Sequence, residues 1–257
     1  MTDDIILIKL GGSVVTFKNK PLSSNEDAIK KIAKKLSKLD KKFIIIHGGG
    51  SFGHFWSTKF DMHTKPDNYN VNGISVVHSS MLHLNKVIID ILHKFNLNPY
   101  GISPSVLLSN NKPISKKINE LINMAIYGLT PVTYGDIVYV NNNKYSIMSG
   151  DVLMSILCKE INPLKVIFAV NVDGIYESLE NRQIIKEILV NKINQKMNLN
   201  LKIPYDVTGG IKRKVVEATN IARNGKNVYI VNGFKPEEIE NIINEKEFIG
   251  TIFKGIK

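Results

Sequence analysis

An apolar segment that stops at three consecutive glycines constrains the fold of this chain more than any other feature. Phe43–Ile46 is apolar and leads through His47 into Gly48–Gly50, with His54 four residues further on. A short apolar run ended by glycine is typical of a buried strand. Successive glycines let backbone N–H groups approach an anion, and ligands of open α/β sheets bind at the carboxyl ends of strands. We therefore expect a phosphate-binding loop here, beside which His54 places a titratable hydrogen-bond donor.

The same pattern recurs along the chain. Glycine turns follow three further predicted strands: Gly11-Gly12-Ser13 after Ile5–Leu10, Gly135-Asp136 after Leu129–Tyr134, and Asp173-Gly174 after Lys165–Val172. Taken alone, the turn at Gly11 is equally consistent with an ordinary strand-to-helix connection.

Charged residues lie close in sequence to these turns. Lys9 and Lys18 flank the first turn, and Lys214 follows Gly209-Gly210 at the start of a predicted helix. Glycines at a helix N-terminus followed by lysine suit the terminal phosphates of a nucleotide. Asp151, which precedes an apolar helix, places a carboxylate where it can orient lysines.

Helical periodicity separates the predicted strands. Apolar residues recur every three or four positions over Asn25–Leu39, between the first two strands, which predicts a βαβ unit and a parallel sheet. A helix is also expected over Gly73–Lys94 and a β-hairpin over Asp136–Tyr145. Residues 177–203 are polar and indicate a surface excursion. The chain is thus expected to form an α/β fold with a mainly parallel sheet.

The helix expected over Gly73–Lys94 carries Ile74, Val77 and Met81 on one apolar stripe. Core packing is the usual explanation of such a stripe. These three residues also lie close in sequence to the loop at His54, so they can wall an apolar pocket. Four histidines in this part of the chain lack the spacing of metal ligands, and solvent-exposed or hydrogen-bonded imidazoles are expected instead. They are His63, His78, His83 and His93.

Composition limits the class of protein. The net charge is +11, from 34 Lys and Arg against 23 Asp and Glu. The lysines are scattered along helix faces rather than interleaved with aromatic residues, which favours small anionic substrates over nucleic acid. The single cysteine, Cys158, lies in an apolar run and is expected to be buried and inert. Neither a signal peptide nor a membrane helix is evident, so a cytoplasmic protein is expected.

The residue types around the turns indicate phosphoryl transfer. This reaction depends mostly on positioning and on neutralising charge. An alcohol acceptor needs a base, whereas a phosphate or carboxylate acceptor is already anionic and needs positive groups to offset repulsion. The loop at His54 offers an imidazole and backbone donors, with lysines nearby and no carboxylate positioned as a base. We therefore expect an anionic acceptor facing lysine-bound ATP.

Six motifs resemble those of the amino-acid kinase superfamily and, within it, of the isopentenyl phosphate kinases. They are Lys9–Ser13, His47–His54, Tyr134–Asp136, Ser149–Asp151, Val172–Tyr176 and Asp206–Lys214. The similarity runs from Lys9 to Thr251. The segment ending in His54 is the most specific part, because acetylglutamate and uridylate kinases lack this histidine and fosfomycin kinase has one of this kind.

This resemblance implies a three-layer αβα sandwich with a mainly parallel central sheet. It implies one domain over residues 1–257, with an acceptor-binding lobe over about 1–160 and an ATP-binding lobe over about 161–257. It further implies a homodimer that uses ATP and Mg²⁺ to convert isopentenyl phosphate into isopentenyl diphosphate, in the alternative mevalonate pathway of isoprenoid biosynthesis.

The resemblance also implies roles for individual residues. Lys9 and Lys18 stabilise the transferred phosphoryl group, with Lys18 favoured as the transition-state residue, and Asp151 orients the lysines. The acceptor side comprises Gly49, His54 and Gly135, with Ile74 and Val77 lining an isoprenoid pocket. The ATP side comprises Lys9, Gly11, Gly12, Ser13, Gly50, Asp151, Asp173, Gly209, Gly210 and Lys214.

Two departures and two alternatives accompany the resemblance. Ala169–Asn171 stands where the family commonly has Thr-Asp, and Val152 replaces a second aspartate; neither change involves a lysine or His54. One alternative keeps the fold but takes fosfomycin or another small phosphonate or carboxylate as acceptor. The other is a non-catalytic ligand sensor or nucleic-acid binder, which the intact lysine set disfavours.

Overall fold

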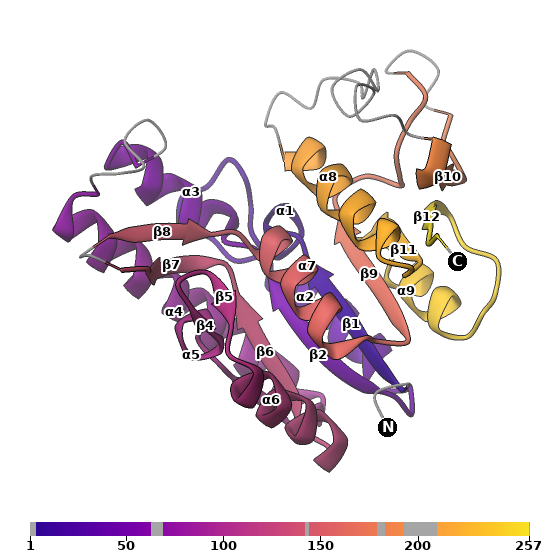
Figure 1. The fold of residues 1–257 in the computed structure, drawn as a ribbon, viewed down its shortest axis with the longest axis horizontal. Coiled ribbons are helices and arrows are strands. Elements are labelled where there is room, and N and C mark those ends of the chain that lie inside the picture. Colours follow the sequence, from indigo (N-terminus) through magenta and orange to yellow (C-terminus); the bar gives the residue numbers. More distant parts are fainter. Residues whose placement is uncertain (1–3, 63–68, 142–143, 179–182, 193–209, 257) are drawn as a thin grey trace.

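The computed structural model describes residues 4–62, 69–141, 144–178, 183–192 and 210–256. Its centre is an eight-stranded sheet in the order β10-β12-β11-β9-β1-β2-β6-β3 (Figure 1). The strands are β1 (Ile5–Leu10), β2 (Lys42–His47), β3 (Pro99–Gly101), β6 (Thr130–Tyr134), β9 (Lys165–Val170), β10 (Glu187–Leu189), β11 (Val228–Asn232) and β12 (Gly250–Lys254). All neighbouring strands are parallel except β11 and β12.

Helices cover both faces of this sheet, as Figure 1 shows. The helices are α1 (Gly12–Val15), α2 (Glu26–Leu36), α3 (Gly50–Lys59), α4 (Val71–Lys94), α5 (Pro104–Leu107), α6 (Ser115–Tyr127), α7 (Gly150–Ile161), α8 (Gly210–Arg223) and α9 (Pro236–Ile243). Helices α2, α4 and α9 share one hydrophobic core with the sheet, and α6, α7 and α8 share the other. The predicted three-layer αβα sandwich is confirmed. None of the described helices is long and apolar enough to cross a membrane.

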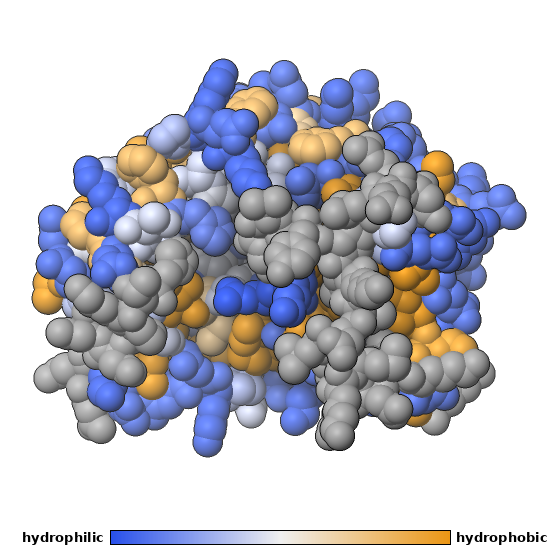
Figure 2. Space-filling view, turned by 90° about the horizontal axis from the view of Figure 1, so that it is seen from above, coloured by the Kyte–Doolittle hydropathy of each residue, from blue (hydrophilic) through white to orange (hydrophobic). Residues whose placement is uncertain are grey.

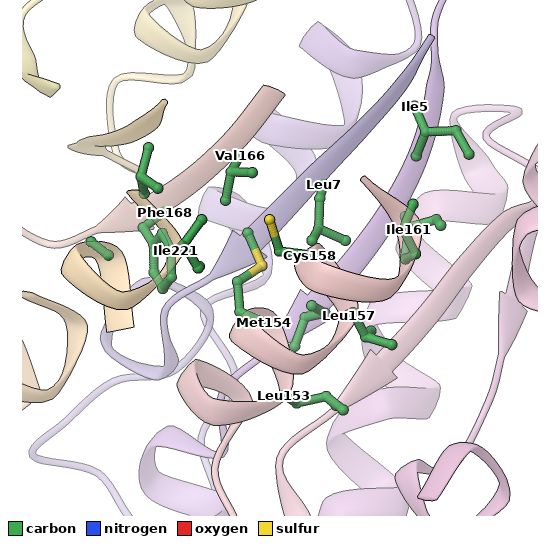
Figure 3. Packing of buried hydrophobic residues seen from close by; sticks show 14 of the residues in the cluster. Ile5, Leu7, Leu153, Met154, Leu157, Cys158, Ile161, Val166, Phe168 and Ile221 are labelled. Atoms are coloured by element: carbon green, nitrogen blue, oxygen red, sulfur yellow. The ribbon is translucent and has the colours of Figure 1, made fainter. Parts of the chain in front are cut away.

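Strand β1 lies in the middle of the sheet, and every residue in it is buried. A parallel strand covered on both faces is expected to be continuously apolar, and Lys9 is the exception within β1. Figure 3 shows Ile5 and Leu7 of β1 packed against α7, with Val166 and Phe168 of β9 alongside. Cys158 is part of this cluster, and burial raises the pKa of its thiol to about 11. The cysteine is therefore buried, as its apolar neighbours in the sequence predict.

Two short elements, helix α3 and strand β10, were not predicted from the sequence. Helix α3 forms directly after the glycines although residues 50–59 show no apolar stripe, and buried Ser51 and Phe52 anchor it. Residues 187–189 form strand β10 parallel to β12, so the prediction of a surface excursion over 177–203 is wrong there. Only Ile188 points inward in β10, which is too short to show a pattern.

The predicted hairpin forms from β7 (Asp136–Tyr139) and β8 (Tyr145–Met148), while residues 142–143 lie outside the described part. A smaller hairpin pairs β4 (Leu108–Ser109) with β5 (Lys112–Pro113), and a 3-10 turn spans Val190–Lys192.

Candidate functional site

Four of the predicted glycine turns lie along one edge of the sheet. Strands β9, β1, β2 and β6 are consecutive neighbours and run parallel. Their carboxyl ends therefore point to the same side, the usual position of ligand sites in α/β sheets. Figure 2 looks onto this edge, where hydrophilic side chains lie beside apolar ones. The structure thus brings together turns that are up to about 160 residues apart in the sequence.

The first two turns touch each other. A Cβ atom on Gly12 would lie 2.7 Å from the Cα of Gly50, and one on Gly48 would lie 2.8 Å from the backbone nitrogen of Gly12. Gly50 also has φ +47°, the left-handed conformation that glycine adopts without steric cost. Only glycine fits this contact, so the backbones of the two turns lie directly against each other. We call the segment formed by Gly11–Ser13 and Gly48–Gly50 the glycine cradle.

A lysine–aspartate–lysine group lies beside the glycine cradle. The Nζ of Lys9 is 2.9 Å from Oδ1 of Asp151, and the Nζ of Lys214 is 3.6 Å from Oδ2. The Lys9 contact is an ion pair without hydrogen-bond geometry. Burial of Asp151 opposes its ionisation, but Lys9, Lys214 and Arg213 outweigh this effect and lower its pKa. The carboxylate is therefore charged and holds two ammonium groups, one from β1 and one from α8.

The corner between β6 and β7 packs against the same group. The backbone N–H of Gly135 donates to the carbonyl of His47 (3.0 Å), and a Cβ on Gly135 would lie 2.8 Å from the nitrogen of Gly150. A Cβ on Gly150 would in turn lie 3.1 Å from Cε of Lys9. Gly135 thus contacts the start of α7, which in turn contacts the buried Lys9.

His47 is a structural residue at the end of β2. Its Nε2 lies 3.2 Å from Oδ1 of Asn85, and its ring stacks on Tyr134. Complete burial lowers the pKa of this imidazole to about 4. His47 is therefore neutral at physiological pH, and it ties β2 to α4.

Lys18 and His54 are exposed residues that follow the two turns of the glycine cradle in the sequence. Lys18 belongs to an exposed turn after α1, and this turn is anchored where the N–H of Ser51 donates to Oγ1 of Thr16 (2.9 Å). His54 is exposed in α3, one turn after Gly50. The roles predicted for Lys18 and His54 stay predictions.

Helix α4 presents an apolar face to the glycine cradle. Val77 and Met81 are buried, and Ile74 is half-buried one turn earlier. A Cβ on Gly49 would lie 3.1 Å from the sulfur of Met81. The hydroxyl of Ser80 donates to the carbonyl of Phe52 (3.1 Å), which fixes α4 to α3. The apolar residues predicted as a pocket wall thus stand next to the loop predicted to bind the acceptor.

Asp173 follows β9, which lies on the side of β1 opposite β2. Hydrogen bonds from Lys235 and Asn232 to the carboxylate of Asp173 lower its pKa; the distances are 2.7 Å and 2.8 Å. Gly210 begins α8, and Ser13 lies in α1. Gly209 falls outside the described residues.

Two polar pairs escaped the sequence analysis. Nδ1 of His78 lies 2.7 Å from Oδ2 of Asp136, 58 residues away in the sequence. Lys235 and Asp173 form the second pair. No local spacing signals either pair, because each joins different elements. Asp136 does stand in the Tyr134–Asp136 motif, which is the one clue the sequence contains.

Comparison with known proteins identifies the class of protein that this fold and site define. A model of the amino acid kinase family matches residues 4–232. The chain belongs to the amino acid kinase family.

Individual relatives narrow the comparison. The isopentenyl phosphate kinase of Thermoplasma acidophilum is 31% identical over 251 residues, which cover 97% of this chain and 100% of the relative. That of Methanocaldococcus jannaschii is 30% identical over 248 residues, covering 91% and 93%. A crystal structure of the T. acidophilum enzyme as a product complex is 28% identical with a TM-score of 0.79, covering 97% of this chain and 100% of that one. The resemblance predicted from the sequence motifs is confirmed.

Proposed function

We propose that this protein is a kinase that transfers the γ-phosphoryl group of ATP to isopentenyl phosphate and forms isopentenyl diphosphate. The observation that carries the proposal is the arrangement at the carboxyl edge of the sheet. A cradle that tolerates no Cβ lies between buried, carboxylate-held lysines and an apolar helix face. Such an edge suits two phosphate groups that meet end to end, one of which carries an apolar tail.

The residues have separable roles in this proposal. Lys9 and Lys214, held by Asp151, draw charge from the transferred phosphoryl group, and Lys18 reaches it from the exposed turn. Gly11, Gly12, Ser13 and Gly50 contact the nucleotide phosphates, with Gly12 and Gly50 offering backbone N–H groups, whereas the N–H of Gly11 donates to the carbonyl of Ala169 (2.8 Å). His54 and Gly49 hold the acceptor phosphate, and Gly135 closes that side. Ile74 and Val77 contact the isoprenoid tail. Asp173, Gly209 and Gly210 complete the nucleotide side, in a lobe over about 161–257 that faces the acceptor lobe over about 1–160.

ATP and Mg²⁺ are the cofactors of this proposal. The cradle fits a polyphosphate because five of its six residues are glycines, which place no side chain between a phosphate and the backbone. Among the described residues no group of three or more His, Cys, Asp or Glu side chains could hold a metal ion, so Mg²⁺ would enter with the phosphates of ATP. When bound, it neutralises charge on the phosphates of ATP. We further propose a homodimer that works in the cytoplasm; light scattering of the purified protein tests the first point by its mass against 28.8 kDa for one chain.

An acceptor panel tests the proposed function. ADP release is measured with isopentenyl phosphate, fosfomycin, N-acetylglutamate and no acceptor, and the first is expected to give the highest kcat/KM. A faster reaction with fosfomycin or the amino acid would overturn the acceptor and retain the kinase. No ADP release above background with any acceptor would overturn the kinase itself.

A variant at His54 tests the acceptor side. Losing a hydrogen bond to a charged group costs about 1.5–3 kcal/mol, so His54→Ala is expected to lower kcat/KM for isopentenyl phosphate roughly 10- to 100-fold. His93→Ala, on an exposed histidine near the end of α4, is the control and should match wild type. A His54→Ala enzyme with the wild-type kcat/KM would show that the acceptor phosphate binds elsewhere.

A further inference from the structure

Side chains on one face of helix α4 contact three separate residues near the proposed acceptor site. Residues three or four positions apart share a face of a helix, and this face carries His78, Met81 and Asn85. His78 pairs with Asp136 after β6, Met81 packs on Gly49 after β2, and Asn85 bonds His47 at the end of β2. In Figure 1, α3, α4, β7 and β8 accordingly gather on the same side of the molecule. Helix α4 thus connects the ends of β2 and β6.

The pair of His78 and Asp136 is asymmetric. The side chain of Asp136 is fully buried, whereas that of His78 is 42% exposed. Both carboxylate oxygens of Asp136 are used, because Oδ1 accepts the N–H of Ile137 at 2.8 Å and Oδ2 faces His78 at 2.7 Å. Burial raises the pKa of this carboxyl to about 6, against the opposing effect of His78. A buried carboxylate that loses its partner is costly, so the imidazole determines where Asp136 rests.

The position of Asp136 determines that of Gly135, its neighbour in the chain. Gly135 makes two close contacts, since its N–H donates to the carbonyl of His47 and a Cβ on it would lie 2.8 Å from the nitrogen of Gly150. Displacing Asp136 would therefore pull the corner away from both contacts. Ile74 and Val77 stand on the preceding turns of the same helix that carries His78. The distance between this apolar wall and Gly135 thus depends on the bond between the imidazole and the carboxylate.

We propose that His78 is a positioning residue for the acceptor, which it serves by holding Asp136 and thereby the Gly135 corner at a fixed distance from α4. The inference rests on the proposed function, because it assumes that the acceptor lies between α4 and Gly135. It assigns His78 no contact with the reacting atoms. The link from this pair to the nucleotide side, built on Asp151, Lys214 and Asp173, is indirect and runs through Gly135 and Gly150 at the start of α7.

The test compares KM values for the two substrates. His78→Leu removes the bond to Asp136 and is expected to raise KM for the acceptor about tenfold, with KM for ATP within twofold of wild type. His78→Asn places an amide donor near the position of Nδ1 and should recover most of the loss. His93→Leu makes the same change on an exposed histidine of α4 and should leave both KM values unchanged. If leucine prevents folding, His78→Ala makes the same comparison, since it adds no exposed apolar surface.

Three outcomes would overturn the proposal. One is an unchanged acceptor KM in His78→Leu, and another is an equal rise of both KM values, as a general loss of structure would give. The third is a failure of His78→Asn to do better than His78→Leu. All ratios are measured with whichever acceptor the wild-type enzyme phosphorylates fastest. A wrong acceptor assignment therefore appears in the wild-type panel, whereas a wrong role for His78 appears in the ratio of variant to wild type.

Discussion

The residue with the largest consequence is Lys9, a buried ammonium in the middle of an apolar strand. Its side chain is 3% exposed and its partner is Asp151. Placing a lysine there costs folding free energy unless it is paired, which suggests that its position serves chemistry rather than stability. Sequence alone indicated this, because Lys9 interrupts an otherwise apolar run two residues before Gly11 and Gly12.

Replacing Lys9 tests this interpretation. Lys9→Met keeps the length of the side chain and removes its charge, so kcat is expected to fall at least 100-fold while the fold persists. Steady-state kinetics and circular dichroism measure the two effects. Lys165→Met is the matched control, because Lys165 is another buried lysine with a carboxylate partner, Glu245, at the opposite end of its strand. A Lys9→Met enzyme as active as the control would remove Lys9 from the reaction.

His47 provides a prediction about pH and stability. Its folded-state pKa of about 4 lies below the ordinary 6.5, so the unfolded chain takes up a proton first as the pH falls. The free energy of unfolding should therefore decrease from pH 6.5 down to pH 4, by at most about 3 kcal/mol, and His47 should contribute no pH dependence above that range. Urea unfolding at several pH values measures this for wild type and for His47→Gln, which cannot titrate. Parallel curves for the two proteins would contradict the assignment.

At the scale of elements, the two touching turns of the glycine cradle explain why α1 and α3 begin where they do. Gly50 combines a left-handed backbone with contact to Thr16 and Gly12, so Gly50→Ala suffers both strain and overlap. Gly128 has φ +105° at the end of α6 but open space around it. Gly128→Ala is therefore the matched control, which suffers strain alone.

The pair of variants separates these two effects. The left-handed conformation costs a non-glycine residue roughly 1–2 kcal/mol, and Gly128→Ala should lose about that much stability. Gly50→Ala is expected to lose at least about 2 kcal/mol more, since backbone atoms would have to move. Urea unfolding gives both values. Equal losses would show that the cradle is not tightly packed.

The helices and strands also show which parts of the fold could be predicted from the sequence. The strands, their glycine ends and the βαβ units were predictable because each depends on neighbours in the chain. Helix α3 was not, since its residues bury little and show no apolar stripe. The bonds from His78 to Asp136 and from His47 to Asn85 were equally hidden, because they join side chains 58 and 38 residues apart. Local sequence patterns predict helices, strands and turns. They do not predict these side-chain contacts, because the residues meet only after the sheet has formed.

For the whole molecule, ATP is expected to stabilise the fold because the lysines and the cradle that we propose to bind it come from distant parts of the chain. A ligand that binds only the native state at a concentration 100 times its Kd adds about 2.7 kcal/mol to the free energy of unfolding. Mg-ATP should therefore raise the melting temperature of wild type by several degrees, as measured by differential scanning fluorimetry. Lys214→Met should respond much less, while Lys254→Met, on the last strand, should respond like wild type. An unchanged shift in Lys214→Met would place the nucleotide away from α8.

The order of strands has a consequence for biosynthesis. Strand β1 emerges from the ribosome first, yet one of the two strands that flank it, β9, begins only at Lys165. A nascent chain must therefore carry this largely apolar strand with one edge unpaired while β2 and β6 are being made. Chains in that state are prone to pair with one another, so the yield of folded protein in a cell depends on translation speed and on chaperones that cover this edge until β9 arrives.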